Sequence, residues 1–454
     1  MMMNKQLLRV SALVGLMYFA AGARLQAQTV VLPQTAASPQ AAGNTRSGNS
    51  AAVAPTVAGE QSVAGRKNSA ASQSKPYLIM ISLDGFRSDY AVQYKARNLL
   101  GLSQNGIRAK SMFPSYPSKT FPNHYSIITG LYPAHHGIVD NRFYDASRRQ
   151  EYSLSNKVAV RDGSWYGGTP LWVLAEKQQL LSASYYWVGS EADIQHTRPT
   201  YYFNYADTIP IGVRIQKVID WLTLAPAKRP HLITFYMPEV DHAGHTFGPG
   251  SDKVRQAVHF ADSAIGVLAR RVDSLKLDMN YIVVSDHGMA GVNRVNEIPI
   301  SIDSLGITNC KVYGAETQLN LYFSREKEII PVFNHLKELE GRYTVYLKRD
   351  VPARFHYGMD DDKFNRIGEI VLIARFPNVF GSQEHRGPLG THGFDPRLPE
   401  MGAVFYAWGP AFKSGMVIPS FENVNVFPLA AEILKLKVTE PIDGQLSVLK
   451  NTLK

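Results

Sequence analysis

Seven side chains that could bind metal ions are spread over more than three hundred positions of this 454-residue chain. They are carboxylates and imidazoles together with one threonine, at Asp84, Thr120, Asp241, His245, Asp286, His287 and His392. Carboxylate and imidazole ligands together suit zinc, and two neighbouring ions can hold a phosphoryl group between them. These residue types therefore predict a two-metal site for phosphoryl chemistry.

Three apolar runs of strand length place most of these side chains. Each run ends just before its polar residues: Tyr77–Leu83 before Asp84, Leu232–Met237 before Asp241 and His245, and Tyr281–Ser285 before Asp286 and His287. The runs alternate with segments of helical spacing at residues 213–224 and 253–275. This alternation predicts an α/β fold, with a mostly parallel central sheet and helices on both faces. Ligands of such sheets bind at the carboxyl ends of the strands, where these residues fall.

Five short motifs, in chain order, resemble those of the nucleotide pyrophosphatase/phosphodiesterase family of the alkaline phosphatase superfamily. They are Leu83-Asp-Gly-Phe-Arg87, Pro117-Ser-Lys-Thr-Phe-Pro-Asn-His124, Asp241-His-Ala-Gly-His245, Ser285-Asp-His-Gly288 and Gly390-Thr-His-Gly393. No single motif identifies a family, but the ordered set covers the chain from about residue 77 to 410. The resemblance implies an alkaline phosphatase-like fold.

The resemblance also implies two Zn²⁺ ions per chain and divides the ligands between them. One ion would be held by Asp241, His245 and His392. The other would be held by Asp84, Asp286, His287 and the oxygen of Thr120.

Thr120 is the candidate nucleophile. Pro114 and Pro117 keep the preceding segment extended, and a helix is predicted to follow over residues 123–128. A hydroxyl at the start of a helix meets its positive end and free backbone N–H groups, which favour a phosphate. Coordination to zinc would lower the hydroxyl pKa enough for attack on phosphorus. The alternative for an isolated threonine at this place is an ordinary helix cap.

The resemblance assigns further residues to the substrate. Asn141, 21 residues after Thr120, matches the family asparagine that binds a non-bridging phosphate oxygen; otherwise it would be a turn residue. Phe121 and Tyr205 resemble the pair of rings that sandwich a nucleobase, and such stacking tolerates any base. Tyr236 is expected to line the same pocket, although each ring could instead serve loop packing.

Departures from related enzymes favour a phosphodiester substrate. Monoesterases of the superfamily carry a Lys-x-Arg pair where this chain has Phe203-Asn-Tyr205, and sulfatases need Cys or Ser followed by Pro and Arg where it has Thr120-Phe-Pro-Asn123. We therefore expect zinc-dependent hydrolysis of nucleotide phosphodiester and pyrophosphate bonds at the α-phosphorus. The reaction would pass through covalent Thr120 and release a nucleoside 5′-monophosphate. A lipid or choline phosphodiesterase, and a non-catalytic surface binding protein stabilised by metal, remain alternatives.

Composition divides the chain into three parts. Residues 1–27 resemble a secretory signal, with an apolar run of 13 residues that is too short to span a bilayer comfortably. Residues 28–75, rich in Ala, Ser, Gln, Gly and Thr, predict a disordered linker. Residues 76–454 form the expected catalytic domain, with loops over the site at 141–210 and an inserted α+β subdomain at 290–385. The protein is expected to be exported, periplasmic or secreted, with no membrane span in the mature chain.

The charge bears on the binding partners of the chain, and the cysteine content bears on what stabilises its fold. Of the net charge of +10, residues 1–75 supply +6, from seven basic residues against Glu60, so the remainder carries about +4. We therefore expect no stable nucleic-acid partner, and a small-molecule diester as the substrate. The lone Cys310 excludes an intramolecular disulfide, so the fold must rest on packing and metal. The sequence leaves the oligomeric state open.

Overall fold

A computed structural model describes residues 59–295, 297–299, 310–381 and 387–454. The predicted signal segment and the first part of the predicted linker lie outside these residues. Within the described part of the chain, nine strands form one central sheet in the order β1-β8-β7-β9-β2-β10-β19-β3-β20. Their bounds are β1 (Glu60–Ser62), β2 (Tyr77–Leu83), β3 (Gly106–Ala109), β7 (Ser182–Tyr185), β8 (Tyr201–Phe203), β9 (Leu232–Met237), β10 (Met279–Val284), β19 (Phe405–Trp408) and β20 (Met416–Ile418).

The centre of the sheet is parallel. Strands β8, β7, β9, β2 and β10 pair in parallel, whereas β19 runs antiparallel to both β10 and β3. The apolar runs identified in the sequence are the inner strands, since a strand buried on both faces reads as a continuous apolar segment. The predicted mostly parallel sheet is confirmed.

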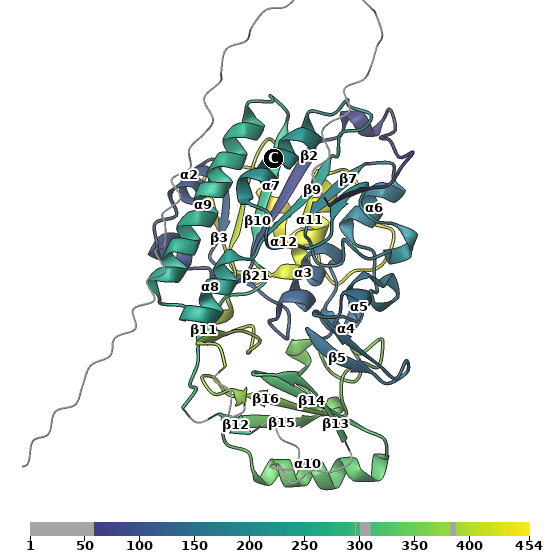
Figure 1. Cartoon of the computed structure of the whole chain (residues 1–454), viewed down its shortest axis with the longest axis vertical. Helices are drawn as coiled ribbons and strands as arrows, with labels where there is room; N and C mark the ends of the chain where they lie inside the picture. Colours follow the sequence, from purple (N-terminus) through teal and green to yellow (C-terminus); the bar gives the residue numbers. More distant parts are fainter. Residues whose placement is uncertain (1–58, 296, 300–309, 382–386) are drawn as a thin grey trace, which may run out of the picture. The chain divides into compact units, whose positions relative to one another are not determined.

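Helices cover both faces of this sheet (Figure 1). Successive residues of β2 point to opposite faces, so Leu78 and Met80 enter one core while Ile79 and Ile81 enter the other. The first core contains residues of α3 (Thr120–Thr129), α6 (Leu171–Lys177) and α11 (Val426–Ile433). The second contains residues of α2 (Arg97–Gln104), α7 (Ile211–Leu222), α8 (Glu239–Phe247) and α9 (Asp252–Asp273).

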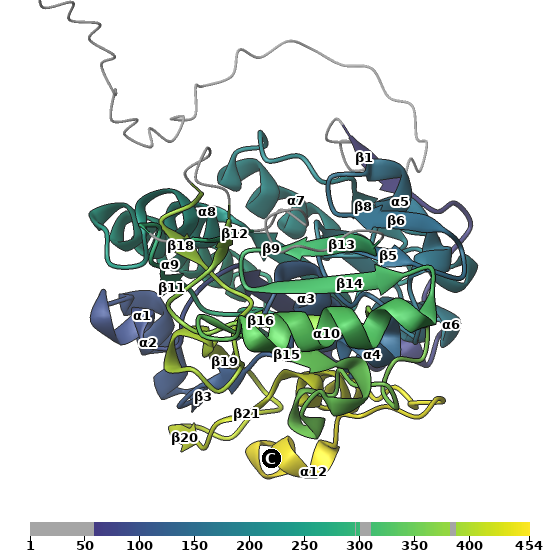
Figure 2. The ribbon, with the colours of Figure 1, turned by 90° about the horizontal axis from the view of Figure 1, so that it is seen from below.

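A smaller four-stranded sheet is inserted between β10 and β19, where the α+β subdomain at 290–385 was predicted (Figure 2). Its antiparallel strands lie in the order β13 (Cys310–Ala315), β14 (Gln318–Phe323), β16 (Ile370–Ala374) and β15 (Tyr343–Leu347). Helix α10 (Ile329–Glu338) packs on it through Leu336. Two short ladders precede and follow this sheet along the chain: β11 (Ala290–Gly291) with β18 (Gly390–Thr391), and β12 (Ile298–Pro299) with β17 (Phe380–Gly381).

The remaining α-helices and strands of the described chain are short. They are α1 (Tyr90–Gln93), β4 (Met112–Phe113), α4 (Pro133–His136), β5 (Arg142–Asp145), β6 (Gln150–Ser153), α5 (Lys157–Arg161), β21 (Phe421–Glu422) and α12 (Leu446–Leu449). None of the helices in the described ranges combines the length and apolar composition that crossing a bilayer requires.

Two sequence predictions need correction. The predicted linker extends too far, because β1 pairs with β8 at the sheet edge and the buried Asn68 side chain bonds backbone groups at three places. A few well-placed polar side chains order residues 59–75 despite their low apolar content. The segment 141–210 was predicted as loops, yet it supplies β7 and β8 to the central sheet as well as pocket walls. Strands this short carry little periodicity.

Candidate active site

Three neighbouring parallel strands bring the predicted metal residues together. Asp84 follows β2, Asp286 and His287 follow β10, and Asp241 lies in the first turn of α8, the helix that follows β9. Because these strands are adjacent and parallel, their carboxyl ends meet at one edge of the sheet. Gly85 allows the close approach: its φ is +66°, and a Cβ there would lie 2.8 Å from the Cα of Asp241.

His245 and His392 reach the same edge by different routes. His245 is four residues after Asp241 on α8, so both side chains lie on one face of that helix. His392 directly follows β18, which pairs with β11 just after His287. This pairing stacks the rings of His287 and His392, with centroids 3.5 Å apart and planes 12° apart.

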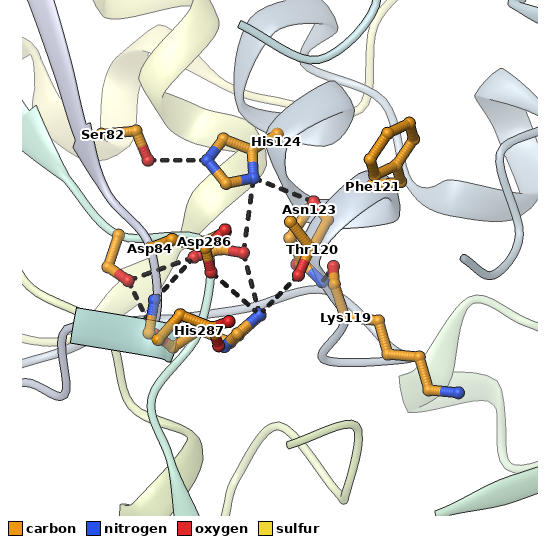
Figure 3. Close-up of polar contacts among 12 residues, drawn as sticks. Ser82, Asp84, Lys119, Thr120, Phe121, Asn123, His124, Asp286 and His287 are labelled. Carbon is orange, nitrogen blue, oxygen red and sulfur yellow. Dashed lines mark hydrogen bonds and ion pairs between the residues drawn. The ribbon is translucent and has the colours of Figure 1, made fainter. Parts of the chain in front are cut away.

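One group of ligand-type atoms surrounds His287 (Figure 3). His287 Nε2 lies 2.8 Å from Asp286 Oδ2, 3.6 Å from Asp84 Oδ1 and 3.2 Å from Thr120 Oγ1. All three partners were predicted to share one ion with His287.

A second group adjoins the first. His245 Nε2 lies 3.3 Å from Asp241 Oδ1 and 3.2 Å from His392 Nε2, and His392 Nε2 lies 3.8 Å from Asp241 Oδ1. His287 also has a ligand atom within 4.8 Å of those of Asp241 and His392, so it borders both groups. The structure thus brings together all seven residues predicted for the metal site.

The histidines are oriented to present Nε2 to a cation. The Nδ1 atom of each ring faces a backbone carbonyl: Gly288 for His287 at 2.9 Å, Gly390 for His245 at 2.8 Å and Ser118 for His392 at 2.8 Å. A carbonyl accepts the Nδ1 proton, which leaves the Nε2 lone pair for a metal.

The carboxylates also fit a cation. Among the described residues, Asp84 Oδ1, Asp241 Oδ1 and Asp286 Oδ2 are buried oxygens without a hydrogen-bond donor. Burial, followed by the negative charges of Asp286 and Asp241, raises the pKa of Asp84 well above its usual value. Such crowding is costly unless positive charge compensates it. Nitrogen and oxygen donors in this number fit a pair of divalent ions such as zinc.

Thr120 is the first residue of α3, and the extended Lys119 is its N-cap. The hydroxyl therefore lies at the positive end of a ten-residue helix, as predicted, although the helix starts three residues earlier than expected. Asn141 lies beside it, because its Oδ1 accepts the Phe121 backbone N–H at 2.9 Å. Because this bond uses the amide oxygen, the NH₂ group is the part of the Asn141 side chain that can donate to a ligand.

A cavity of about 290 Å³ opens beside Thr120. Phe121, Tyr205 and Tyr236, the three rings predicted for the pocket, all line it. Tyr205 is 44% exposed, whereas the buried Tyr236 donates its hydroxyl proton to Asp84 Oδ2 at 2.6 Å. Tyr236 therefore serves the carboxylate group as well as the pocket wall.

Two cationic side chains also line this cavity, although this chain has no cation at the position where monoesterases carry the Lys-x-Arg pair. Lys157 and Arg161 come from α5, and Arg161 pairs with Glu191 at 3.0 Å. Glu191 also accepts the backbone N–H of Tyr205 at 2.7 Å, which ties that ring to the pocket. Sequence reasoning missed this wall, since nothing local marks α5 as part of a site.

Sequence reasoning also left out His124. It lies one turn after Thr120 on α3, with Nδ1 2.9 Å from the Thr120 carbonyl oxygen and 3.3 Å from Asp286 Oδ2 (Figure 3). On the other side, its Nε2 lies 2.7 Å from Ser82 Oγ. The i, i+4 spacing from Thr120 was the signal that could have placed it at the site.

The fold and this site together define a protein of the alkaline phosphatase-like class. The profile described as type I phosphodiesterase / nucleotide pyrophosphatase matches residues 78–395, and the chain belongs to that family. The resemblance stated from the sequence motifs is confirmed.

Individual relatives agree with this assignment. The chain is 35% identical over 390 residues to a venom phosphodiesterase of Naja atra, covering 83% of this chain and 46% of the relative. It is also 35% identical over 398 residues to ectonucleotide pyrophosphatase/phosphodiesterase family member 1 of Mus musculus, covering 85% and 43%. The chain thus spans less than half the length of these relatives.

Among solved structures, murine ectonucleotide pyrophosphatase/phosphodiesterase 5 is similar, with a TM-score of 0.77 and 27% identity. The match covers 84% of this chain and 100% of that one. That structure is of an inactive threonine-to-alanine variant in complex with AMP.

Proposed function

We propose that this protein is a two-zinc hydrolase of nucleotide phosphodiester and pyrophosphate bonds that acts at the α-phosphorus and releases a nucleoside 5′-monophosphate. One observation carries the proposal. The Thr120 hydroxyl lies at a helix N-terminus, 3.2 Å from His287 Nε2, and it borders both the carboxylate and histidine groups and an aromatic cavity. Nucleophile, cation site and base pocket therefore meet at one residue.

The first step is attack by Thr120 Oγ1 on the α-phosphorus. A bond forms between that oxygen and phosphorus while the hydroxyl proton is released to solvent and the bond to the leaving oxygen breaks. The nucleoside phosphoryl group remains on Thr120. Asp84, Asp286 and His287 would hold one zinc beside the hydroxyl, and the other ion would be held by Asp241, His245 and His392. Bound zinc supplies Lewis acidity, which lowers the pKa of a hydroxyl and offsets negative charge around phosphorus.

Water then completes the reaction. It attacks the phosphoryl–Thr120 ester, the bond between phosphorus and Oγ1 breaks, and the hydroxyl of Thr120 is restored as the 5′-monophosphate leaves. In both steps the non-bridging oxygens develop negative charge. The Asn141 NH₂ group and the free N–H groups at the start of α3 are placed to donate to them. A neutral amide suits a diester, which carries a single negative charge.

The cavity supports a nucleoside as the group retained on Thr120. Phe121 and Tyr205 offer ring faces at its wall, and stacking contributes about 1–3 kcal/mol per base. The AMP bound by the murine relative, in a variant that lacks one threonine and is inactive, supports both the nucleoside and the threonine nucleophile. We also propose that the protein is exported, in keeping with the predicted signal segment and with relatives named as venom and ecto-enzymes.

A comparison of three chromogenic substrates tests the proposal. The nitrophenyl ester of thymidine monophosphate should be cleaved far faster than nitrophenyl phosphate or nitrophenyl phosphocholine. Faster cleavage of the monoester would place the protein among monoesterases, with Lys157 and Arg161 as the cations. Faster cleavage of the phosphocholine ester would favour the lipid or choline alternative, and no cleavage of any ester would favour a binding protein.

A further inference from the structure

Two bonds, one on each side of Thr120, join its segment to the segment of Asn141. Before Thr120, Lys119 Nζ lies 3.0 Å from Asp140 Oδ1 and 3.2 Å from Asp140 Oδ2. After it, the Phe121 backbone N–H donates to Asn141 Oδ1 at 2.9 Å. The residues that flank the proposed nucleophile are therefore tied to two consecutive residues of the other segment.

Asp140 is the centre of this arrangement. It is 1% exposed, and its Oδ1 also accepts the backbone N–H of Asn141 at 2.6 Å. Its Oδ2 accepts the Nε2 proton of Gln318 at 3.0 Å. Both oxygens are thus saturated with donors, which fixes the orientation of the carboxylate and, through the backbone bond, the start of Asn141.

Lys119 faces away from the phosphoryl site. Its ammonium also approaches the Ala315 carbonyl oxygen at 3.4 Å, and in Figure 3 it points away from Asp286 and His287. The residue is 7% exposed. Burying a Lys–Asp pair costs desolvation energy that an apolar pair would not, so the pair is a weak source of stability. What it supplies is a fixed distance between two backbone segments.

Residues of the inserted subdomain form hydrogen bonds to Asp140 and to the residue before it. Gln318, at the start of β14, also donates to the Tyr357 hydroxyl at 3.1 Å, and that hydroxyl donates to the Val139 carbonyl oxygen at 3.1 Å. At the same hairpin, Thr317 Oγ1 donates to the His392 carbonyl oxygen at 3.3 Å. The tip of the β13–β14 hairpin thus contacts both the Asp140 segment and the loop that carries His392.

We infer that the buried Lys119–Asp140 pair is a positioning device, which sets the placement of the Thr120 hydroxyl relative to the Asn141 amide. Neither side chain is placed to touch the phosphoryl group, so both act through the residues next to them. The inference rests on the proposed function, since it assigns Thr120 and Asn141 their roles. A misplacement of about 1 Å in such a geometry can cost about 10²-fold in rate.

The primary test is Asp140→Asn, assayed with the nitrophenyl ester of thymidine monophosphate. We expect kcat to fall by about 10- to 100-fold, with KM and zinc content unchanged. In an Asn141→Ala background, the same substitution should cost at most about threefold, because its effect passes through Asn141. An equal loss in both backgrounds, or a loss that follows zinc content, would overturn the inference.

The matched control is Asp145→Asn. Asp145 is also a buried carboxylate, on β5 four residues after Asn141, and it pairs with the buried Arg366 at 2.9 Å. Removing its charge should lower the melting temperature and leave kcat unchanged. A similar fall in kcat for Asp140→Asn and Asp145→Asn would show that loss of either buried carboxylate lowers kcat. That result would contradict a specific positioning role for Asp140.

A second variant covers the case in which Asp140→Asn fails to fold with Lys119 left unpaired. Lys119→Met combined with Asp140→Asn removes both charges, so it should fold and bind zinc, yet still show the lowered kcat. Wild-type kcat in this folded variant would refute the positioning role. Failure of the proposed function is a different outcome, seen as wild-type protein without diesterase activity or as Thr120→Ala with normal turnover.

Discussion

The carboxylate and histidine groups and the aromatic cavity share Thr120 but are built in different ways. The first is buried except for the half-buried Asp241 and His245, and it contains oxygens without donors. Apart from Thr120, its residues come from the ends of adjacent parallel strands, the helix after one of them and the β18 ladder. The second is walled by α5 and by loop residues such as Tyr205, which is 44% exposed. The proposed reaction would thus depend mainly on the sheet, whereas the proposed base pocket would depend in part on surface segments, which vary more freely.

Removal of metal should have the largest effect, because it acts on the buried side of this comparison. A chelator should abolish diesterase activity and destabilise the fold, since the crowded carboxylates Asp84, Asp241 and Asp286 would repel one another. Zinc should restore activity, and elemental analysis should find about two ions per chain. Full activity in a metal-free preparation would contradict the proposed mechanism.

The Thr120→Ala substitution comes next. It removes the attacking oxygen but keeps the carboxylate and histidine groups, so zinc content and melting temperature should be retained. We expect kcat to fall by about three orders of magnitude or more, because an unpositioned water must replace the hydroxyl. Thr120→Ser is the matched control and should keep part of the activity. Near-normal turnover of the alanine variant with zinc bound would mean that Thr120 is not the nucleophile.

Asn141→Ala should have a smaller effect on kcat. The loss of one donor to the developing charge corresponds to about 3–4 kcal/mol, or about 10²- to 10³-fold in kcat. A turn asparagine, Asn378, whose amide donates to the Arg375 carbonyl, is the control, and its alanine variant should keep wild-type kcat. Equal effects of the two substitutions would remove Asn141 from the proposed mechanism.

On the cavity side, Tyr205→Ala should raise KM for the thymidine diester by about tenfold, which corresponds to stacking of about 1–3 kcal/mol. Tyr205→Phe keeps the ring and should behave like the wild type. Neither substitution should change the slow cleavage of nitrophenyl phosphocholine, which has no base. If Tyr205→Ala lowered kcat as much as Asn141→Ala does, the separation of base binding from the reaction would be contradicted.

The smallest effect on activity is expected at the sheet edge, where β1 supplies no residue to the metal-type groups or to the cavity. The Glu60 carboxylate accepts Lys217 Nζ at 2.9 Å and Trp221 Nε1 at 2.8 Å. Glu60→Gln should lower the free energy of unfolding by about 1–3 kcal/mol and leave kcat unchanged. Glu151→Gln, in an exposed pair with Arg142, should change it by less than about 0.5 kcal/mol. Denaturant titration distinguishes the two.

Local sequence pattern was enough to predict much of the fold. The runs before Asp84, Asp241 and Asp286 are strands, and β2 and β9 have the predicted bounds. The seven metal-type residues were predicted because each sits in a recognisable motif, and their ligand roles stay a prediction. The i, i+4 pair Asp241 and His245 is itself a local pattern.

Other features depend on contacts between distant segments, which no local pattern reports. The α5 wall of the cavity, the Lys119–Asp140 pair and the bond from Tyr236 to Asp84 all join residues far apart in sequence. The strand β1 was predicted as linker because its three residues give too short a window for periodicity. Its place is set by pairing with β8 and by the Glu60 bonds.

Strand β19 has a consequence for the order in which this chain can fold. It lies between β10 and β3, so β3, completed by residue 109, has no place in the sheet until residues 405–408 have been synthesised. Joining segments separated by nearly three hundred residues is slow, and the unpaired edges of β10 and β3 stay open to association meanwhile. The residues that follow His392 include no predicted ligand, yet through β19 they supply the closing step of assembly.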